Sequence, residues 1–194
     1  MINEDGINIH GNVIDNKATY RKKGRKIIFG RNHPAFLHRG DTYYLTDISV
    51  YADGMIYCWE WVTIEEFKEK LLKKEIVTKL PENAQISLHL ILHCNVSNIL
   101  YKVPESEFFK DVLDTIEELN GRATSIVNFI KAKKQFWENQ TPENKELYHN
   151  TFKNMPAHKM KYVLGGRDKK YFREIGIKVY ELVYDLDDHP DNQN

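Results

Sequence analysis

The sequence predicts an α+β protein, in which a mostly antiparallel sheet with one packed helix is followed by a helical region and a final strand. Two observations predict this order. The hydrophobic period changes near Pro104 from two, which is typical of strands, to 3.6, which is typical of helices. Asp53 and Gly54 mark a hairpin in the strand-rich half, because glycine tolerates the positive φ of a tight turn.

Four segments follow from this pattern. Residues 1–24 are expected to form a flexible N-terminal arm and residues 25–103 a β-rich core with one helix. Residues 104–184 are expected to be a helical region that returns to the sheet, and residues 185–194 an acidic tail. We expect 25–184 to form one compact unit, because a chain of 194 residues suffices for one full-sized domain and nothing requires two.

Short apolar runs predict the strands of the first half, separated by stretches that contain glycine or proline. These runs cover residues 26–29, 35–37, 42–51 and 55–62. Apolar and polar residues then alternate without a break over residues 86–96, which predicts one half-buried strand. Residues 177–184 alternate in the same way and are expected to form the last strand.

Helices are predicted from capping signals and helical spacing. Thr63 as N-cap and Glu66 three residues later form a capping box, which starts a helix over residues 64–74. Apolar residues at helical spacing predict three longer helices and one short helix between residues 105 and 174.

The composition excludes several classes of protein. Lys and Arg total 28, as do Asp and Glu, so the formal net charge is zero, unlike the basic balance of dedicated nucleic-acid binders. No run approaches the ~20 apolar residues of a membrane span, and the polar start carries no export signal, so no membrane partner is expected. Cys58 and Cys94 lack C-x-x-C spacing, which indicates reduced thiols and a soluble protein of the cytoplasm.

The Asp53-Gly54 hairpin has two possible registers. A two-residue turn separates apolar from polar residues more cleanly and is favoured, and it places Asp47 opposite Glu60. Carboxylates directly opposite each other repel, so the pair is a candidate site for a cation or a basic partner. A three-residue turn that begins at Ala52, with a glycine bulge, slips the register by one and places the two carboxylates on opposite faces.

Aromatic residues gather around this hairpin, as they do in protein–protein interfaces. In the favoured register Trp59 and Trp61 share an apolar face with Ile48, so a core position competes with an interface position for both rings. The candidate binding residues are Asp47, Glu60, Tyr43, Tyr51, Trp59 and Trp61.

A dense basic run could contact phosphates or simply be a solvated loop. This basic patch comprises Arg21, Lys22, Lys23, Arg25 and Lys26. His89 and His93 would lie ~13 Å apart along a strand, too far to share one zinc ion through bonds of ~2.1 Å, so no metal site is expected. Gly165-Gly166 could present backbone N–H groups to an anion, but it lacks a complete phosphate-loop pattern and is expected to be a turn.

No catalytic motif and no cofactor are predicted, so an enzyme is not favoured. The leading hypothesis is a non-enzymatic protein-binding module, for example an immunity or inhibitor protein of bacterial type that occupies a partner protein. The alternative is an RNA- or DNA-associated protein that uses the basic segment and the sheet aromatics. A hydrolase that uses Asp47 and Glu60 is a weaker hypothesis.

Overall fold

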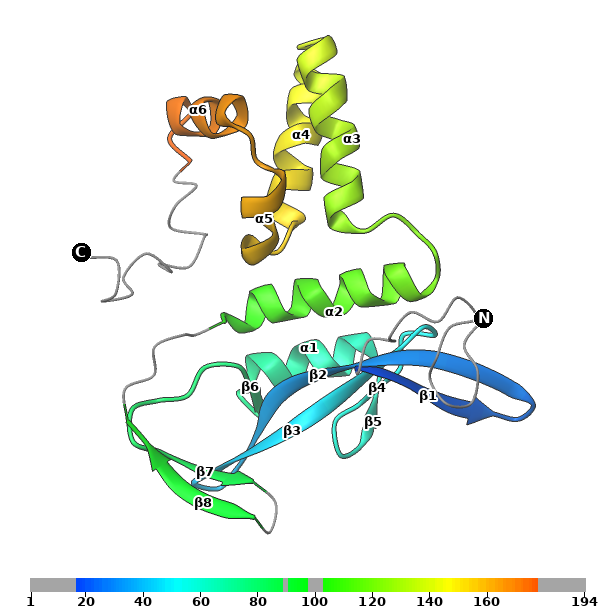
Figure 1. The fold of residues 1–194 in the computed structure, drawn as a ribbon, viewed down its shortest axis with the longest axis vertical. Helices are drawn as coiled ribbons and strands as arrows, with labels where there is room; N and C mark the ends of the chain where they lie inside the picture. Colours follow the sequence, from blue (N-terminus) through cyan, green and yellow to red (C-terminus); the bar gives the residue numbers. More distant parts are fainter. Residues whose placement is uncertain (1–16, 89–90, 98–102, 178–194) are drawn as a thin grey trace, which may run out of the picture. The chain divides into compact units, whose positions relative to one another are not determined.

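The computed structural model describes residues 17–88, 91–97 and 103–177, which belong to two units that meet in sequence between Arg122 and Ala123. Among the described residues the first unit contains a sheet and two helices, and the second contains four helices (Figure 1). The predicted α+β class with a mostly antiparallel sheet in the N-terminal half is therefore confirmed. The predicted last strand, from residue 178 on, and the acidic tail lie outside the described residues.

Two long strands form the centre of the sheet in the first unit. Its strands are β1 (Ala18–Lys23), β2 (Lys26–Arg39), β3 (Thr42–Tyr51), β4 (Ile56–Tyr57), β5 (Trp61–Val62), β6 (Ile76–Val77), β7 (Ala84–Leu88) and β8 (Leu92–Val96). β2 pairs with β3 from Gly30 to Arg39, and the free edges of this pair are extended by β1 and β6 on one side and by β4 and β7 on the other. Only β7 runs parallel to its neighbour β3 among the described strands.

β2 continues through Gly30 and Pro34, where the sequence predicted a break. The N–H of Asn32 donates to the Lys17 carbonyl at 2.7 Å, and the N–H of His38 donates to the Glu75 carbonyl at 2.9 Å. Because successive N–H groups of a strand point to alternate edges, the Pro34 nitrogen faces the same edge. Among the described residues, no strand pairs with that edge between the β1 and β6 pairings, so the missing N–H of Pro34 removes no ladder bond there.

The prediction of one strand over residues 86–96 is wrong. These residues belong to the antiparallel hairpin of β7 and β8, in which Ile86 lies opposite Cys94 and Leu88 opposite Leu92. A tight hairpin can preserve the alternation of apolar and polar residues across its turn, which hides the turn from a periodicity argument. His93 lies in β8, and His89 lies outside the described residues.

Helix α1 (Ile64–Leu72) starts as its capping box predicted. The N–H of Thr63 donates to Glu66 Oε2 at 2.7 Å, and the N–H of Glu66 donates to Thr63 Oγ1 at 3.2 Å. The helix buries Phe67 and Leu71 in the core of the first unit.

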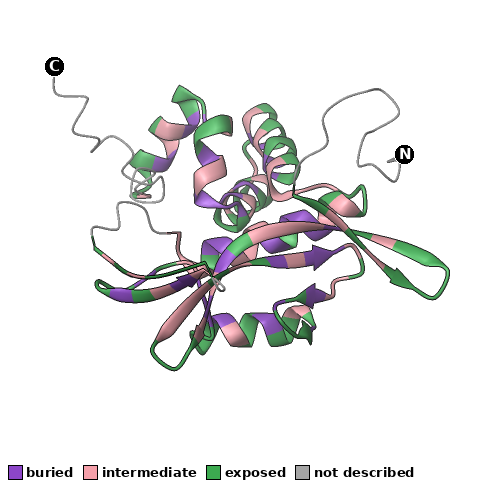
Figure 2. Ribbon diagram, turned by 60° about the horizontal axis from the view of Figure 1, so that its bottom comes forward, coloured by how far each residue is buried: buried purple, intermediate pink, exposed green. Residues whose placement is uncertain are grey.

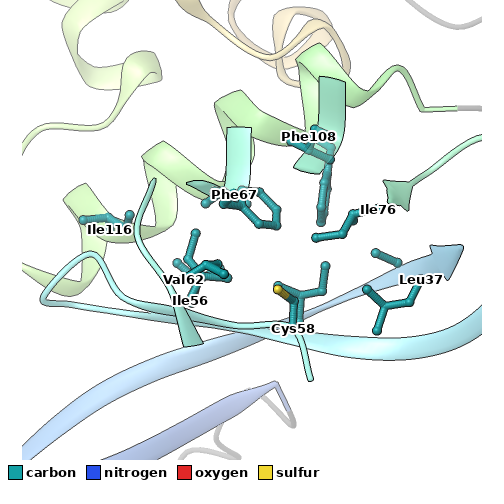
Figure 3. Close-up of a cluster of buried hydrophobic side chains, with 13 residues drawn as sticks. Leu37, Ile56, Cys58, Val62, Phe67, Ile76, Phe108 and Ile116 are labelled. Atoms are coloured by element: carbon teal, nitrogen blue, oxygen red, sulfur yellow. The ribbon is translucent and has the colours of Figure 1, made fainter. Parts of the chain in front are cut away.

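Helix α2 (Glu105–Leu119) packs beside α1 on the inner face of the sheet. The sequence grouped α2 with the later helices, but its buried side chains join the core of the first unit (Figure 3). Phe108 is one of them, and its ring centroid lies 6.2 Å from that of Phe67. Burying side chains of this size contributes roughly 1.5–3 kcal/mol each.

Residues 18–23, which the sequence assigned to an N-terminal arm, form strand β1 instead. All six residues of β1 pair with β2, from Ala18 opposite Arg31 to Lys23 opposite Lys26. Regular cross-strand bonds satisfy the backbone here, although little of this hairpin is buried. Figure 2 shows it largely in the colour of exposed residues.

The second unit is helical throughout its described residues. Its helices are α3 (Ser125–Glu138), α4 (Pro142–Asn154), α5 (Ala157–Val163) and α6 (Gly166–Glu174). α3 and α4 lie side by side (Figure 1), and an aromatic core that includes Phe129, Tyr148 and Phe172 joins the helices. Among the described residues of either unit, no helix combines the length and the apolar character that a membrane crossing requires.

Candidate interaction surface

The hairpin at Asp53-Gly54 adopts the register that the sequence analysis did not favour. Val50 lies opposite Ile56, and the N–H of Tyr51 donates to the Met55 carbonyl at 3.0 Å, so three residues form the turn. Gly54 takes a φ of +79°, as the bulged turn requires. The prediction of a two-residue turn is therefore wrong.

This register removes the proposed carboxylate pair. Asp47 is exposed on β3 opposite Pro34, whereas Glu60 lies in the turn between β4 and β5. Glu60 Oε1 is 2.7 Å from Lys70 Nζ, which also lies 2.8 Å from Glu75 Oε2. Hydrogen bonds to Glu60 and Glu75 raise the pKa of Lys70, and the bond from Lys70 lowers the pKa of Glu75. The hydrolase hypothesis and the cation site lose their geometric basis.

An aromatic and basic cluster lies instead on the outer face of the sheet, opposite α1 and α2. The Arg21 guanidinium carbon is 5.3 Å from the ring centroid of Tyr51 and 5.0 Å from that of Trp61. Arg21 also forms an ion pair with Asp53, and Trp61 lies 5.1 Å from the ring of Tyr57. We call these five residues the Arg21 cluster. Tyr51 is buried, whereas Tyr57 is 38% and Trp61 50% exposed. The buried Tyr51 ring therefore lies beneath two rings that solvent can reach.

Gly30 makes room for the base of this cluster. It lies opposite Tyr51 in the β2–β3 ladder. A Cβ atom at this position would lie 2.8 Å from Tyr51 Cδ1 and 2.8 Å from the Val50 carbonyl oxygen. Only a residue without a side chain lets the Tyr51 ring approach β2 this closely.

The remaining aromatic candidates lie elsewhere. Trp59 lies in the same turn as Glu60, with a positive φ of 67°, and its Nε1 donates to Thr46 Oγ1 at 3.1 Å. Tyr43 stacks on His38 with 4.3 Å between ring centroids. Of the six predicted binding residues, the structure brings Tyr51 and Trp61 together. The sequence assigned Arg21 only to the basic patch, because its contacts join strands that are distant in the chain. Tyr57 was not among the predicted binding residues, although its partner Trp61 lies only four positions away.

A small pocket of about 200 Å³ lies beside the turn between β4 and β5. It is lined by Leu37, His38, Arg39, Cys58, Glu60, Lys70, Glu75 and Ile76. Burial raises the pKa of the Cys58 thiol, which keeps it protonated and a poor nucleophile. Lys70 is already bonded to two carboxylates, so its amine is not a free nucleophile.

The Arg21 cluster and the pocket lie within a segment that matches a known family. Residues 18–123, more than half of the chain, match the family model described as "Domain of unknown function (DUF7638)". The chain belongs to the DUF7638 family. No curated protein and no solved structure matches the chain.

The basic patch lies on the β1–β2 hairpin of the DUF7638 domain. Arg21 points into the Arg21 cluster, and the other four residues of the patch, Lys22, Lys23, Arg25 and Lys26, are exposed. Gly24 has a φ of +61° in the turn that joins the two strands. The predicted basic patch is thus divided between a packed arginine and an exposed tip.

The glycine pair Gly165-Gly166 lies beyond the matched DUF7638 segment and binds a side chain of its own unit. The N–H of Gly165 donates to Asp168 Oδ2 at 2.8 Å. Asp168 also accepts hydrogen bonds from Trp137 Nε1 at 3.1 Å and from the Tyr148 hydroxyl at 2.8 Å. Lys133 Nζ lies 2.5 Å from the same carboxylate.

Burial of Asp168 opposes its ionisation, but the hydrogen bonds outweigh it and lower the pKa of this carboxyl. The carboxylate of Asp168 therefore takes the place that an external anion would have at this helix start.

Proposed function

We propose that the DUF7638 domain is a non-enzymatic protein-binding module whose contact surface centres on the Arg21 cluster. The observation that carries the proposal is Trp61, which is 50% exposed although its ring packs against Arg21 and Tyr57. Trp, Tyr and Arg are the residues most enriched at the energetic centres of protein interfaces. A ring that is already fixed in place loses little conformational freedom on binding, which favours affinity.

Further residues extend this surface along β3. Leu45 and Asp47 lie on the same face as Tyr57, because Ser49 is opposite Tyr57 and alternate residues of a strand share a face. Leu45 is 39% exposed and Asp47 is exposed. Along β3 the aromatic centre is followed first by the Asp47 carboxylate and then by the apolar Leu45 side chain, so the face combines the apolar and polar groups that protein interfaces contain.

We extend the proposal to a small inhibitor or immunity protein that acts by occupying its partner. The pocket contains the protonated thiol of Cys58 and the amine of Lys70, which is paired with two carboxylates. Both features support a binding role rather than covalent chemistry. Both cysteines of the chain, Cys58 and Cys94, are free, which supports a reducing compartment such as the cytoplasm.

The experiment compares three forms of the full-length chain as bait in extracts of the source cells: wild type, Trp61→Ala and Leu72→Ala. Leu72 is 73% exposed on α1 and is the matched control for loss of an exposed apolar side chain. A partner should be captured by the wild type and by Leu72→Ala and lost by Trp61→Ala. The purified partner should then bind Trp61→Ala about 30-fold more weakly in calorimetric titration, as expected for an interface hot spot.

Circular dichroism spectra and melting temperatures of the three proteins establish that each is folded. If folded Trp61→Ala retains the partner with unchanged affinity, the Arg21 cluster is not the contact surface and the proposal fails.

A further inference from the structure

The hairpin of β1 and β2 extends past the part of the sheet that the helices cover (Figure 1). Helix α2 contacts this hairpin through Glu118, whose carboxylate accepts hydrogen bonds from Arg31 at 2.7 and 3.1 Å. From Arg31 toward the turn, the two strands carry side chains on both faces, most of them exposed to solvent. We call residues 20–29 the ribbon.

Arg21 is paired with Asp53, but the cations at the tip of the ribbon have no acidic partner among the described residues. The sequence from Lys17 to Gly40 contains no Asp or Glu. Within the part of the chain that the structure describes, the four exposed cations at the tip form no ion pair; they are Lys22, Lys23, Arg25 and Lys26. Because the formal net charge of the whole chain is zero, this cluster is a local concentration of positive charge and does not reflect a basic composition.

One face of the ribbon places Lys22, one of the four tip cations, beside two exposed rings. Tyr20 lies directly opposite Phe29, and Lys22 directly opposite Ile27. Tyr20 is 60% and Phe29 45% exposed. Side chains directly opposite each other have Cβ atoms about 5 Å apart, so the two exposed rings occupy neighbouring positions on the face that also carries Lys22.

We propose that the ribbon binds single-stranded nucleic acid, with phosphates at the four tip cations and bases stacked on Tyr20 and Phe29. Each nucleotide supplies both an anion and a flat ring, which is the pairing that this face presents. An acidic protein segment would satisfy the lysines but would leave the rings without a stacking partner. In a duplex the bases are already stacked on one another, so the rings could not reach them.

This proposal goes beyond protein binding and uses residues outside the Arg21 cluster. The full-length chain is titrated into fluorescein-labelled single-stranded oligothymidylate and oligouridylate of about 12 nucleotides, and binding is followed by fluorescence anisotropy. Four phosphate contacts predict a slope of about −2.8 for log K against log salt concentration. Affinity should therefore fall about 50-fold between roughly 50 and 200 mM salt.

Charge variants test the tip. Lys22→Gln combined with Lys23→Gln should reduce the salt slope by about 1.4, because two phosphate contacts are lost. Lys79→Gln combined with Lys131→Gln removes the same charge from two exposed positions outside the ribbon and should leave the slope and the affinity close to those of the wild type.

Ring variants test stacking. Tyr20→Ala should weaken binding roughly tenfold without changing the salt slope, and Tyr20→Trp should restore it. Tyr162→Ala, at a position 74% exposed in the second unit, is the matched control and should bind like the wild type.

Three results would overturn the proposal. The first is equal affinity for single strands and for a duplex of the same length together with no effect of Tyr20→Ala. The second is displacement of the oligonucleotide by polyglutamate at equal concentration of charge, which identifies the ribbon as a site for acidic protein. The third is preference for vesicles of phosphatidylserine and phosphatidylcholine over oligonucleotide.

Trp61→Ala separates this proposal from the function proposed above. This variant should lose the protein partner and keep the oligonucleotide. The variant with Lys22→Gln and Lys23→Gln should keep the protein partner and bind the oligonucleotide more weakly.

Discussion

Arg21 packs its guanidinium against the ring of Trp61, with 5.0 Å between the guanidinium carbon and the ring centroid. The contact joins β1 to β5, which lie at opposite ends of the strand order β1-β2-β3-β4-β5. A cation over a tryptophan face is attracted by the ring quadrupole, and the flat guanidinium can stack on it as well. The pair therefore holds the two outermost strands of this part of the sheet together.

The first prediction concerns this pair. Arg21→Lys should lower the free energy of unfolding by about 1 kcal/mol, because a lysine keeps the charge and loses the planar stack. A double-mutant cycle with Trp61→Leu, measured by urea denaturation, should give a coupling energy of about 0.5–1 kcal/mol. The cycle of Arg21→Lys with Trp59→Leu should be additive, because the Trp59 ring packs against Arg39 instead. Additivity in both cycles would contradict the assigned contact.

The second prediction concerns Gly30. Gly30→Ala should destabilise the first unit by about 1–3 kcal/mol, because the added Cβ atom overlaps Tyr51 and the Val50 carbonyl oxygen. Gly166→Ala is the control, since nothing lies within 4 Å of a Cβ atom there. Thermal denaturation of both variants checks the difference. An unchanged melting temperature for Gly30→Ala would show that Tyr51 does not lie over this glycine.

The third prediction concerns thiol reactivity. Cys58 is 2% exposed and burial raises the pKa of its thiol, whereas Cys94 is partly exposed on β8. Iodoacetamide should therefore modify Cys94 well before Cys58 in the folded protein, and mass spectrometry of the digested protein measures the two rates. In concentrated guanidinium chloride the two rates should become similar. Faster labelling of Cys58 in the native protein would mean that the pocket opens or activates this thiol.

The fourth prediction concerns Asp168. Its pKa in the folded protein is lowered, so the unfolded chain binds more protons at acidic pH. The stabilisation by this carboxylate is complete above the ordinary Asp pKa of about 3.9 and is lost as the pH falls through the lower pKa of the folded state. Asp168→Asn should cost the second unit about 2–4 kcal/mol at neutral pH and should flatten its acid dependence.

Fluorescence of Trp137, the tryptophan that donates to Asp168, reports this transition in a background of Trp59→Phe and Trp61→Phe. Tyr148→Phe removes one donor to the same carboxylate and should cost about 1 kcal/mol. An acid transition identical in wild type and Asp168→Asn would rule out the carboxylate as its origin.

The helix-capping signal at Thr63 predicted local structure correctly. The capping box of Thr63 and Glu66 depends on two residues within one turn, and the structure confirms the helix start. Glycine and proline were less reliable guides in the sheet. Gly30 and Pro34 predicted a break in β2, but Gly30 allows close ring packing, and Pro34 lies at an edge with which no described strand pairs at that point.

The candidate site was harder to predict, because it depends on the register and on contacts between distant strands. A difference of one residue in the turn at Asp53-Gly54 decides whether Glu60 faces Asp47 or bonds to Lys70. Polarity patterns favoured the wrong turn because they placed Trp61 in the core, and the structure leaves this ring half exposed. Nothing in the local sequence of Arg21 indicates that it packs against Trp61.

The segment that matches the DUF7638 family ends at residue 123, beside the point where the structure divides into two units. Each unit has an apolar core of its own, one around Phe67 and Phe108 and the other around Tyr148 and Phe172. Removal of the helical unit at this junction would therefore take no side chain from the core around Phe67 and Phe108. The segment that matches the DUF7638 family thus carries a complete apolar core within its own boundaries.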